Sequence, residues 1–479
     1  MNRREFLASA TCLAVSGPRT RRSGAVADDS GGAEGVVRVK VNTRRPLGTT
    51  PADFVGLGYE ISSVARVGLL SAQNRNYVKL VRTLGASGVI RVGGNTSDFS
   101  RFVPGGESVS APKGTVMNEA RLRELGSFLE ATGWRLIWGL NLGGGTEHEA
   151  VEEARAVMAV AKDKLLAFEI GNEPDLFDRS TAHRPEGYTY ESYLSEYRRY
   201  KAAIRAELPS ATFAGPDVAA ATDWVTRFAV DEGNDLKLLT HHYYRDCAKP
   251  TSTLDELLHT DPKLGPQLAE LRAASMSSHV PYRICETNSF CGGGKPGVSD
   301  TFGSALWALD YMFTLASAGA AGVNMETGVN QLGFISSYSP IGDDEHGTYS
   351  ARPEYYGLLA FAQSGMGQRV EVDFDAQGGN LTAYAVLRDQ KRLVLTLINK
   401  GAMGEKSVSI EAERKFRRAN VLRLAGPSLE SRQGVMLGGS AVSAGGDWKA
   451  RVVEALAIRR EVCEVRVPAA SAAMVMLED

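Results

Sequence analysis

The chain has 479 residues, of which 43% are hydrophobic and 23% charged, the composition of an ordinary soluble protein with room for two domains. Its formal net charge is −2, so it has no overall positive field of the kind that draws in nucleic acid or long polyanions. Composition therefore argues against nucleic-acid partners, while a small acidic substrate stays possible.

Residues 1–27 have the features of an export signal. Arg3 and Arg4 precede an apolar run that ends at Val15, and Ala25–Ala27 offers the small residues that a signal peptidase accepts. The paired arginines predict the twin-arginine route, to the periplasm or the exterior. The run has about ten residues, whereas roughly twenty span a bilayer, so we expect no permanent membrane anchor. Without the five Arg and one Glu of this segment, 49 basic and 55 acidic residues remain, a net charge of −6.

The next two segments are short. Residues 28–35 are acidic and rich in glycine, which predicts a flexible leader. Residues 36–48 begin with Val36–Val41, a run of β character. We expect this strand to join the C-terminal sheet, which would make that domain discontinuous.

Residues 49–367 alternate short apolar runs with longer segments of helical periodicity, the pattern of repeated βα units around a parallel sheet. Eight units predict an α/β fold, a (β/α)₈ barrel whose active site lies at the carboxyl ends of the strands. The expected strands are Phe54–Ile61, Val89–Gly93, Arg135–Leu140, Leu165–Gly171, Thr212–Gly215, Leu236–Tyr244, Tyr282–Thr287 and Gly322–Thr327.

Residues 368–479 have a different texture, with short strand-like runs joined by glycine-rich or charged connections. This predicts an all-β domain, a sandwich. Its expected strands are Arg369–Phe374, Leu381–Leu387, Arg392–Ile398, Ser407–Ala412, Asn420–Leu424, Val435–Leu437, Val462–Val467 and Ala472–Leu477.

Two glutamates follow predicted barrel strands. Glu173 comes after the fourth strand and Glu286 belongs to the seventh. Glycoside hydrolysis needs such a pair, since one carboxyl group protonates the leaving oxygen while the other attacks the anomeric carbon or activates water. Pro174 ends the strand and is expected to hold Glu173 in an extended conformation. A capping or salt-bridged Glu is the alternative for either residue alone.

Cysteine and histidine positions predict no metal centre and no cofactor. No cysteine pair has the spacing of zinc ligands, and adjacent His241 and His242 point to opposite faces of a strand. Cys285 and Cys291 could form a disulfide, but a buried Cys beside a free loop thiol is the favoured interpretation. The glycines do not form a nucleotide-binding pattern.

Four motifs carry a family resemblance. Ile170–Asp175, Glu286–Ser289 followed by Gly292–Gly294, Arg91–Asn95 and His241–Tyr244 together resemble glycoside hydrolase family 79, the β-glucuronidase and heparanase family, in a bacterial member. The resemblance covers the barrel, and in the C-terminal domain it is only architectural. It implies a retaining double displacement with Glu173 as acid/base and Glu286 as nucleophile.

The resemblance also implies supporting residues. Arg91 and Tyr243 are expected near Glu286, where they would favour its charged form, and Glu173 would keep its proton in less positive surroundings. His241 and Tyr243 are assigned to the inward face of their strand, although a hydrogen-bonded core pair is the commoner role for such residues. Asn172 would bond the sugar 2-hydroxyl, with a loop-satisfying amide as the alternative.

Further residues would line the sugar pocket. Glu60 and Asn95 match positions that contact distant hydroxyls, and loop capping is an equal alternative for both. Gly292 and Gly293 let the backbone approach a ligand closely, and Lys295 is adjacent, so this loop is a candidate reader of the uronate carboxylate, as is Tyr338. A flexible turn is the alternative for the glycine loop.

The heparanase branch has a lysine where this chain has Thr96 and is basic overall, so the expected substrate is not an extended sulfated chain. We expect a monomeric exo-acting enzyme that removes terminal glucuronic acid, or its 4-O-methyl form, from a glycan. The alternatives are an endo-acting heparanase-like glucuronidase, a neutral-sugar hydrolase of the same clan, and a non-catalytic carbohydrate-binding protein.

Overall fold

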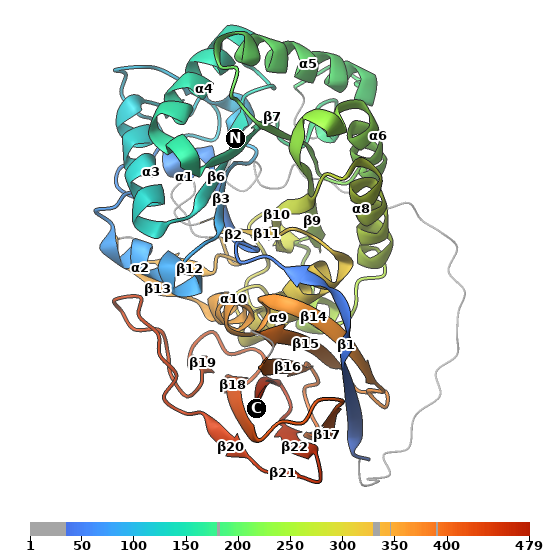
Figure 1. The fold of residues 1–479 in the computed structure, drawn as a ribbon. Coiled ribbons are helices and arrows are strands. Elements are labelled where there is room, and N and C mark those ends of the chain that lie inside the picture. The colour runs from blue at the N-terminus through green and yellow to red at the C-terminus, as the bar shows by residue number, and fades with distance from the viewer. Residues whose placement is uncertain (1–34, 180–182, 329–335, 345, 389–390) are drawn as a thin grey trace.

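The computed structural model describes residues 35–179, 183–328, 336–344, 346–388 and 391–479. The predicted export signal and nearly all of the predicted leader lie outside these residues. A closed barrel of strands with surrounding helices forms the upper part of the view in Figure 1, and a second body made mainly of strands lies below it. No helix among the described residues is long and apolar enough to cross a membrane.

The barrel consists of parallel strands, and its fold is the predicted (β/α)₈ type. Neighbouring strands follow the order β10-β11-β2-β3-β6-β7-β8-β9. Three strands run past their predicted ends, β8 from Gly215 to Val218, β9 from Tyr244 to Cys247 and β10 from Thr287 to Cys291, and these extensions matter for the site. The strands are β2 (Val55–Glu60), β3 (Val89–Gly93), β6 (Arg135–Leu140), β7 (Leu165–Ile170), β8 (Phe213–Val218), β9 (Leu236–Cys247), β10 (Tyr282–Cys291) and β11 (Val323–Glu326).

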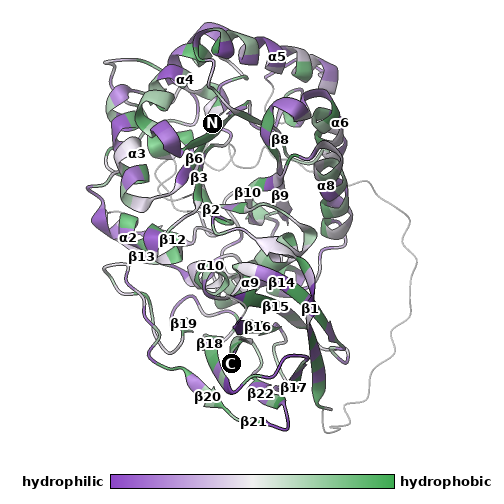
Figure 2. Ribbon diagram, viewed as in Figure 1, coloured by the Kyte–Doolittle hydropathy of each residue, from purple (hydrophilic) through white to green (hydrophobic). Residues whose placement is uncertain are grey.

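Helices cover the outside of the barrel; most of them are amphipathic (Figure 2), whereas α9 and α10 are buried over most of their length. In α2 the predicted stripe of Tyr77, Leu80, Val81 and Leu84 is buried. A capping box between Thr146 and Glu149 fixes the start of α4. The helices are α1 (Ile61–Val64), α2 (Arg75–Leu84), α3 (Glu119–Thr132), α4 (Glu147–Ala161), α5 (Tyr190–Glu207), α6 (Thr222–Glu232), α7 (Leu254–Leu258), α8 (Leu264–Ser278), α9 (Phe302–Ala318) and α10 (Pro353–Ser364).

The inside of the barrel has an apolar lower layer and a charged upper layer. The lower layer contains one small or aliphatic residue from each of six strands: Val89, Ile137, Ala167, Ala214, Leu238 and Cys285. Side chains two residues further along a strand share the same face, so Arg91 and Glu169 lie directly above, and they form an ion pair. The barrel is therefore a packed core that becomes polar towards its carboxyl end.

The second body is a long mixed sheet to which the N-terminal strand belongs. β1 (Val37–Thr50) pairs antiparallel with β14 (Gly367–Phe374) and parallel with β17 (Lys406–Ala412), and it buries Val37, Val39 and Val41. Both partners of β1 are thus C-terminal strands, as the sequence led us to expect. Two short two-stranded sheets lie apart from it: β4 (Arg101–Phe102) pairs parallel with β5 (Val116–Met117), and β12 (Ile341–Asp343) pairs antiparallel with β13 (Tyr349–Ala351).

The long sheet folds over on itself to enclose a core. Its order is β19-β18-β23-β16-β15-β14-β1-β17-β22-β21, with β20 beside β18, and one apolar cluster draws residues from both halves of this order. This gives the domain its sandwich character. The remaining strands are β15 (Leu381–Arg388), β16 (Arg392–Asn399), β18 (Arg418–Ala425), β19 (Met436–Leu437), β20 (Glu454–Leu456), β21 (Ile458–Arg459), β22 (Val462–Val467) and β23 (Ser471–Glu478).

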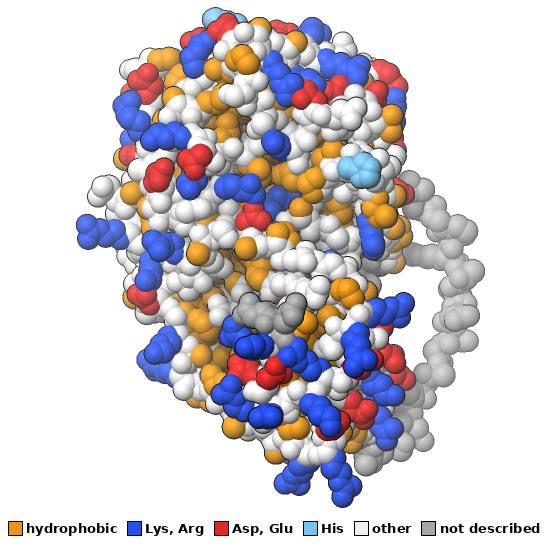
Figure 3. Space-filling view, in the orientation of Figure 1, with side chains coloured by type: hydrophobic (Ala, Val, Ile, Leu, Met, Phe, Trp, Pro, Cys, Tyr) orange, Lys and Arg blue, Asp and Glu red, His pale blue; other side chains and the backbone are white. Residues whose placement is uncertain are grey.

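Charged side chains of both signs lie side by side on the surface. On the face drawn in Figure 3, Lys and Arg are most frequent over the strand domain, where acidic side chains lie among them. This face offers no uniform positive track for a long polyanion.

Candidate active site

Glu173 and Glu286 are brought together at the carboxyl end of the barrel. Glu173 follows β7 and precedes the short 3₁₀ helix η3 (Pro174–Leu176). Pro174 had led us to expect an extended backbone at Glu173. This was wrong, because the backbone of Glu173 is left-handed with φ of 51°. The amide N–H of Glu173 donates to the carbonyl of Asp217 at 2.9 Å, and this bond to the next strand holds the unusual conformation.

Glu286 owes its direction to an irregularity in β10. The pairing of β9 with β10 shifts between Ile284 and Glu286, so that Ile284 lies opposite His241 and Glu286 opposite His242. One extra residue, Cys285, is therefore accommodated in β10, as in a β-bulge. Both Cys285 and Glu286 consequently reach the barrel interior, and the carboxyl group of Glu286 lies near that of Glu173.

The two carboxyl groups share one histidine. His242 Nδ1 lies 3.1 Å from Glu173 Oε1 and 4.0 Å from Glu286 Oε2. One oxygen of each glutamate and a ring nitrogen of His242 all lie within 4.8 Å of one another. The side chains of Glu173 and Glu286 are 11% and 10% exposed, so both are open to a ligand. Retaining glycosidases separate their carboxyl groups by about 5 to 5.5 Å, and this approach is of that size.

Two donors hold Glu286. Arg91 Nη1 donates to Glu286 Oε2 at 2.8 Å, and the Tyr244 hydroxyl donates to Oε1 at 3.0 Å. Arg91 is fully buried and also contacts Glu169, Asn172 and Asp217. Both oxygens of Glu286 are therefore held in place, one of them by a charge-assisted hydrogen bond.

Glu173 differs from Glu286 in its surroundings. Burial raises the pKa of Glu173, the charge of Glu286 adds to this, and the hydrogen bond from His242 opposes it. Burial disfavours the charged form of His242, but Asp217 and Glu286 outweigh it and raise the pKa of His242 well above 6.5. The charged form of His242 is thus favoured beside Glu173. Glu286 contacts Arg91 at 2.8 Å and also lies 4.0 Å from His242, so the surroundings of Glu173 are the less positive of the two, and burial favours its protonated form.

The predicted inward pair on β9 was the wrong pair. Tyr243 donates to Asp261 at 2.9 Å and stacks on Tyr311 outside the barrel. His241 is buried on the same outer face, where burial and neighbouring His242 lower its pKa to about 4. His242 and Tyr244 face the site instead. Alternation along β9 had identified the two pairs correctly but could not say which one faces inward.

Asn172, Glu60 and Asn95 surround the carboxyl pair. The Asn172 side-chain oxygen accepts from Arg91 at 2.8 Å, and its amide nitrogen lies 3.5 Å from the Asn95 oxygen. Glu60, at the end of β2, accepts from the amide groups of Asn95 and Thr96 and from the Thr96 hydroxyl. Glu60 therefore holds the loop after β3, which was the alternative role considered for it, and burial raises its pKa to about 7.

The glycine loop and Tyr338 lie together. Gly292, Gly293 and Gly294 all have positive φ, and the Gly293 carbonyl accepts from the Ser337 amide at 2.6 Å. A Cβ on Gly294 would lie 2.9 Å from the Tyr338 nitrogen, so the close approach requires glycine there. The Tyr338 ring lies 6.3 Å from that of Tyr244 and so borders the site. Lys295 is half-buried, and its amide donates to Ser299.

Sequence analysis missed two aspartates of the site, Asp217 and Asp98. Asp217 accepts from Arg91 at 2.5 Å and contacts His242 Nε2 at 2.8 Å, and these two cations lower its pKa despite burial. It follows a cis Gly215–Pro216 bond and has φ of 60°. The Gly-Pro-Asp sequence at the end of a predicted strand was the available signal. Asp98 accepts from the amides of Leu142, Gly143 and Asn172.

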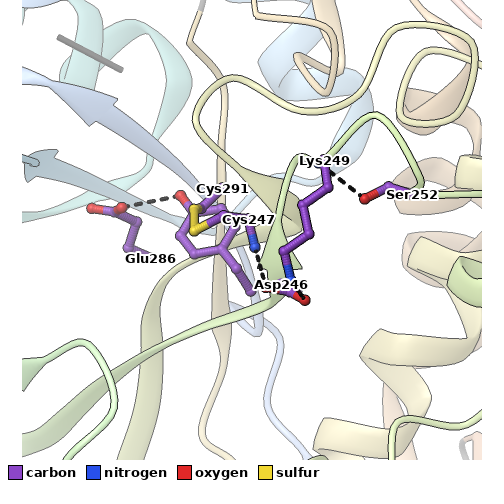
Figure 4. The surroundings of a disulfide bond; sticks show 7 residues. Asp246, Cys247, Lys249, Ser252, Glu286 and Cys291 are labelled. Atoms are coloured by element: carbon purple, nitrogen blue, oxygen red, sulfur yellow. Dashed lines mark hydrogen bonds and ion pairs between the residues drawn. A yellow bond between two sulfur atoms is a disulfide. The ribbon is translucent and has the colours of Figure 1, made fainter. Parts of the chain in front are cut away.

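A disulfide joins the extended ends of β9 and β10. Cys247 and Cys291 are paired in the strand register and bonded through their sulfur atoms, and Figure 4 shows Glu286 beside this disulfide. From the sequence we had considered only a Cys285–Cys291 disulfide and had favoured a free thiol at both positions. The prediction of a free thiol was wrong for Cys291. Cys285 is a free thiol inside the barrel, as is Cys463 in the strand domain.

Two groups of side chains have the spacing of metal ligands among the described residues. They are Glu173 with His242 and Glu286, and Glu169 with Asp217 and Cys285. In the first group both ring nitrogens of His242 already contact carboxylates. In the second, Arg91 bonds both carboxylates. These internal contacts account for both groups as charge-balanced networks.

Two known proteins of similar sequence are fungal β-glucuronidases. The chain is 27% identical over 354 residues to a β-glucuronidase of Aspergillus niger, covering 66% of this chain and 64% of that one. It is also 27% identical over 334 residues to a β-glucuronidase of Neurospora crassa, covering 59% and 57%. The matches thus span less than two thirds of these relatives. No family model matches the chain.

Solved structures share the fold. A 4-O-α-L-rhamnosyl-β-D-glucuronidase from Fusarium oxysporum superposes with a TM-score of 0.75 at 18% identity, covering 92% of this chain and 100% of that one. An arabinofuranosidase from Xanthomonas axonopodis does so with a TM-score of 0.67 at 16% identity, again covering 92% and 100%. At these identities the likeness establishes the barrel with its attached strand domain, and function must be argued from the site.

Proposed function

We propose that this protein is a retaining exo-β-glucuronidase resembling glycoside hydrolase family 79. The observation that carries the proposal is the approach of Glu173 and Glu286 at the barrel mouth, within 4.8 Å through their oxygens and around one shared histidine. The β-glucuronidases from two fungi that share 27% identity with the chain support the choice of sugar.

The proposed reaction has two displacements. Glu173 gives its proton to the glycosidic oxygen while a Glu286 oxygen attacks the anomeric carbon, so the C–O bond to the aglycone breaks and a glycosyl ester forms. Glu173, now a carboxylate, takes a proton from water, whose oxygen attacks the same carbon and releases Glu286. Each glutamate ends in its starting state, and the sugar keeps its β configuration.

The surroundings of the two glutamates suit these roles. Arg91 and Tyr244 orient Glu286 and stabilise it both before attack and as the leaving carboxylate. After the first step Glu173 is an anion, and the adjacent His242 cation would stabilise that form until water is deprotonated. The Asn172 oxygen is fixed by Arg91, and one N–H of its amide group points to Asn95, which leaves the second N–H to donate to the sugar 2-hydroxyl.

We propose that the loop containing Gly292, Gly293 and Lys295, with Tyr338, receives the uronate carboxylate. Thr96 supports an exo-acting enzyme over a heparanase-like one: it is fully buried, its hydroxyl donates to Glu60 and it accepts from the Ser62 amide. It therefore offers no charge to a sulfated chain. The glycan substrate, the monomeric state and export remain parts of this proposal. The disulfide agrees with an oxidising compartment.

The test is a side-by-side assay of aryl β-glycosides of glucuronic acid, glucose, xylose and arabinose. We expect turnover of the glucuronide at least about 100-fold above the neutral sugars, and comparable turnover of a neutral sugar would contradict the uronate assignment. NMR of the first-formed product should show the β anomer. Glu286→Ala and Glu173→Ala should each lower kcat by about 10³-fold or more, and an unchanged rate in either would overturn the mechanism.

A further inference from the structure

A further carboxyl group, Glu326, faces the site and has no part in the chemistry above. It ends β11, and the register places it opposite Gly58 of β2, which in turn lies opposite Arg91 of β3. A Cβ on Gly58 would lie 2.4 Å from Glu326 Oε2. Glycine at this position therefore makes room for a carboxyl group turned into the barrel, at the level of Arg91.

The carboxyl group of Glu326 is buried without the partners that such a group normally has. Only 3% of the residue is exposed, and among the described residues neither oxygen has a hydrogen-bond partner of normal geometry. The nearby Gly328 amide lowers its pKa only in part. Glu60, by contrast, accepts three hydrogen bonds one strand away. An unpartnered buried carboxylate is costly, so the neutral acid is favoured.

The charges around Glu326 favour the same state. The two buried cations at the site, Arg91 and His242, are balanced by Glu286 and Asp217, so another anion would be uncompensated. Burial first, then the charges of Glu286 and Glu60, raise the pKa of Glu326 well above 4.5, and Arg91 opposes this. The neutral titratable groups that face it are tyrosines on β2, α2 and β9 and after β11: Tyr59, Tyr77, Tyr244 and Tyr338.

We propose that Glu326 is a specificity residue of this site, a neutral acid whose O–H donates a hydrogen bond to the carboxylate of the bound uronic acid. The inference rests on the proposed function. Glu326 would act together with the glycine loop and Tyr338. The charged and phenolic donors around the two glutamates are engaged, since Arg91 and Tyr244 bond Glu286 and His242 bonds Glu173 and Asp217. A neutral acid supplies a donor without adding a charge beside the nucleophile. A sugar that lacks the carboxylate has no matching acceptor.

The experiment compares Glu326→Ala and Glu326→Gln in the intact protein. We expect Glu326→Ala to raise KM for an aryl glucuronide, and the inhibition constant of D-glucuronate, by about 10- to 100-fold, the loss of one hydrogen bond to a charged group. The effect on kcat and on inhibition by D-glucose should stay within about threefold. Glu326→Gln keeps an N–H donor and should recover most of the affinity.

A matched control and a spectroscopic signature separate this role from a structural one. Glu153 on α4 is also a buried carboxyl, bonded to Trp138, and burial raises its pKa to about 7. Glu153→Gln should leave KM unchanged. In infrared difference spectra, D-glucuronate should shift the C=O stretch of a protonated carboxyl group in the wild-type protein and in Glu153→Gln, and this band should be absent in Glu326→Gln.

The outcomes distinguish the two proposals. If the wild-type protein neither hydrolyses glucuronides nor binds D-glucuronate, the proposed function fails. Suppose that the wild-type protein does both. If Glu326→Ala then binds D-glucuronate as tightly as the wild type, or if it weakens the binding of D-glucose as much as that of D-glucuronate, the role proposed for Glu326 is wrong and the proposed function stands. If Glu326→Ala does not fold, Glu326→Gln decides. An infrared difference spectrum of Glu326→Gln that still contains the wild-type C=O band on binding of D-glucuronate would overturn the inference.

Discussion

Tyr243 and Tyr244 are adjacent on β9, yet their hydroxyl groups serve different parts of the molecule. Tyr244 donates to Glu286 inside the barrel, while Tyr243 donates to Asp261 outside it. Tyr244→Phe should lower kcat for an aryl glucuronide by about 10- to 100-fold, because a donor to the proposed nucleophile is lost. Tyr243→Phe should keep kcat within about threefold and cost about 1 kcal/mol of stability. Steady-state kinetics measures kcat of the two variants, and denaturant unfolding measures their stability. A lower kcat in Tyr243→Phe than in Tyr244→Phe would contradict the assignment of Tyr244 to the inward face.

The same two residues show what the sequence could and could not predict at a site. Both glutamates could be found because each lies at the end of an apolar run, and Arg91 because it belongs to a motif of the family resemblance. The inward face of β9 depended instead on register, and the register of β9 with β10 is shifted at Cys285. Asp217 has a left-handed backbone with φ of 60°, and Glu173 is held by a bond to the next strand, neither of which local sequence specifies. Tertiary contacts decide these directions.

His242 makes the pH dependence of activity testable. The alkaline limb of kcat/KM should report loss of the Glu173 proton, and the raised pKa of Glu173 places this limb above its ordinary 4.5. His242 lowers that pKa through its hydrogen bond and charge. His242→Gln keeps the hydrogen-bonding capacity but removes the charge, so the limb should move to higher pH. A pH–rate profile measures it, and a limb that moves to lower pH would contradict the role given to His242.

The same substitution has a signature in stability. The pKa of His242 in the folded protein lies well above 6.5, so its contribution to stability is fully present below pH 6.5 and lost as pH rises through the folded-state value. Wild type should therefore exceed His242→Gln in stability most clearly at about pH 5 to 6, with the difference shrinking in alkaline solution. Thermal unfolding across this range is the control for the kinetic experiment.

Strands β9 and β10 supply His242, Tyr244 and Glu286 to the site, and a disulfide joins the ends of these two strands. Their disulfide, Cys247–Cys291, closes a loop with a sequence separation of 44. By chain entropy such a loop is worth about 2 to 4 kcal/mol. Reduction with dithiothreitol, or Cys247→Ser with Cys291→Ser, should lower the free energy of unfolding by this amount, as measured by denaturant titration.

Activity should respond to the same change, because the Gly292–Gly294 loop begins directly after Cys291. Loss of the bridge should raise KM for an aryl glucuronide by severalfold, more than it lowers kcat. The doubly substituted variant is the control, since dithiothreitol should have no further effect on it. Equal stability of the reduced and oxidised protein would show that the register of β9 and β10 holds the strands without the bridge.

The elements themselves were largely readable from the sequence. Apolar runs bounded by glycine or proline gave the barrel strands to within a few residues, and a stripe such as Tyr77 and Leu80 gave α2. The ends of β9 and β10 were not readable, because Tyr244–Cys247 and Asn288–Cys291 mix polar and apolar residues. Those extensions bring the two cysteines into register, so the disulfide was missed together with them.

At the scale of the whole molecule, the first strand and helix α9 connect the two bodies. β1 begins in the strand domain, and the chain then enters the barrel through β2. Helix α9, between β10 and β11, presents Phe313 and Asp310 to the strand domain. Phe313 stacks on Tyr384 with ring centroids 4.6 Å apart. The helix that follows the proposed nucleophile strand is thus held by the second body (Figure 1).

Asp310 is the polar centre of this contact. It accepts from Thr382 at 2.6 Å, Tyr384 at 2.8 Å and Lys400 at 2.6 Å. The Lys400 side chain is only 4% exposed, so removal of Asp310 would leave a buried cation without its partner. Such a loss costs about 3 to 5 kcal/mol, whereas removal of both charges is often nearly neutral. The contact between the bodies therefore depends on the pair being complete.

We accordingly expect Asp310→Ala to lower the free energy of unfolding by about 3 kcal/mol and to separate the calorimetric transition into two, one for each body. Asp310→Ala with Lys400→Met should recover most of that loss, because no unpaired charge remains, and the difference between the two variants measures the coupling. Differential scanning calorimetry provides both readouts. A single sharp transition of unchanged midpoint in Asp310→Ala would mean that packing around Phe313 holds the bodies together without the ion pair.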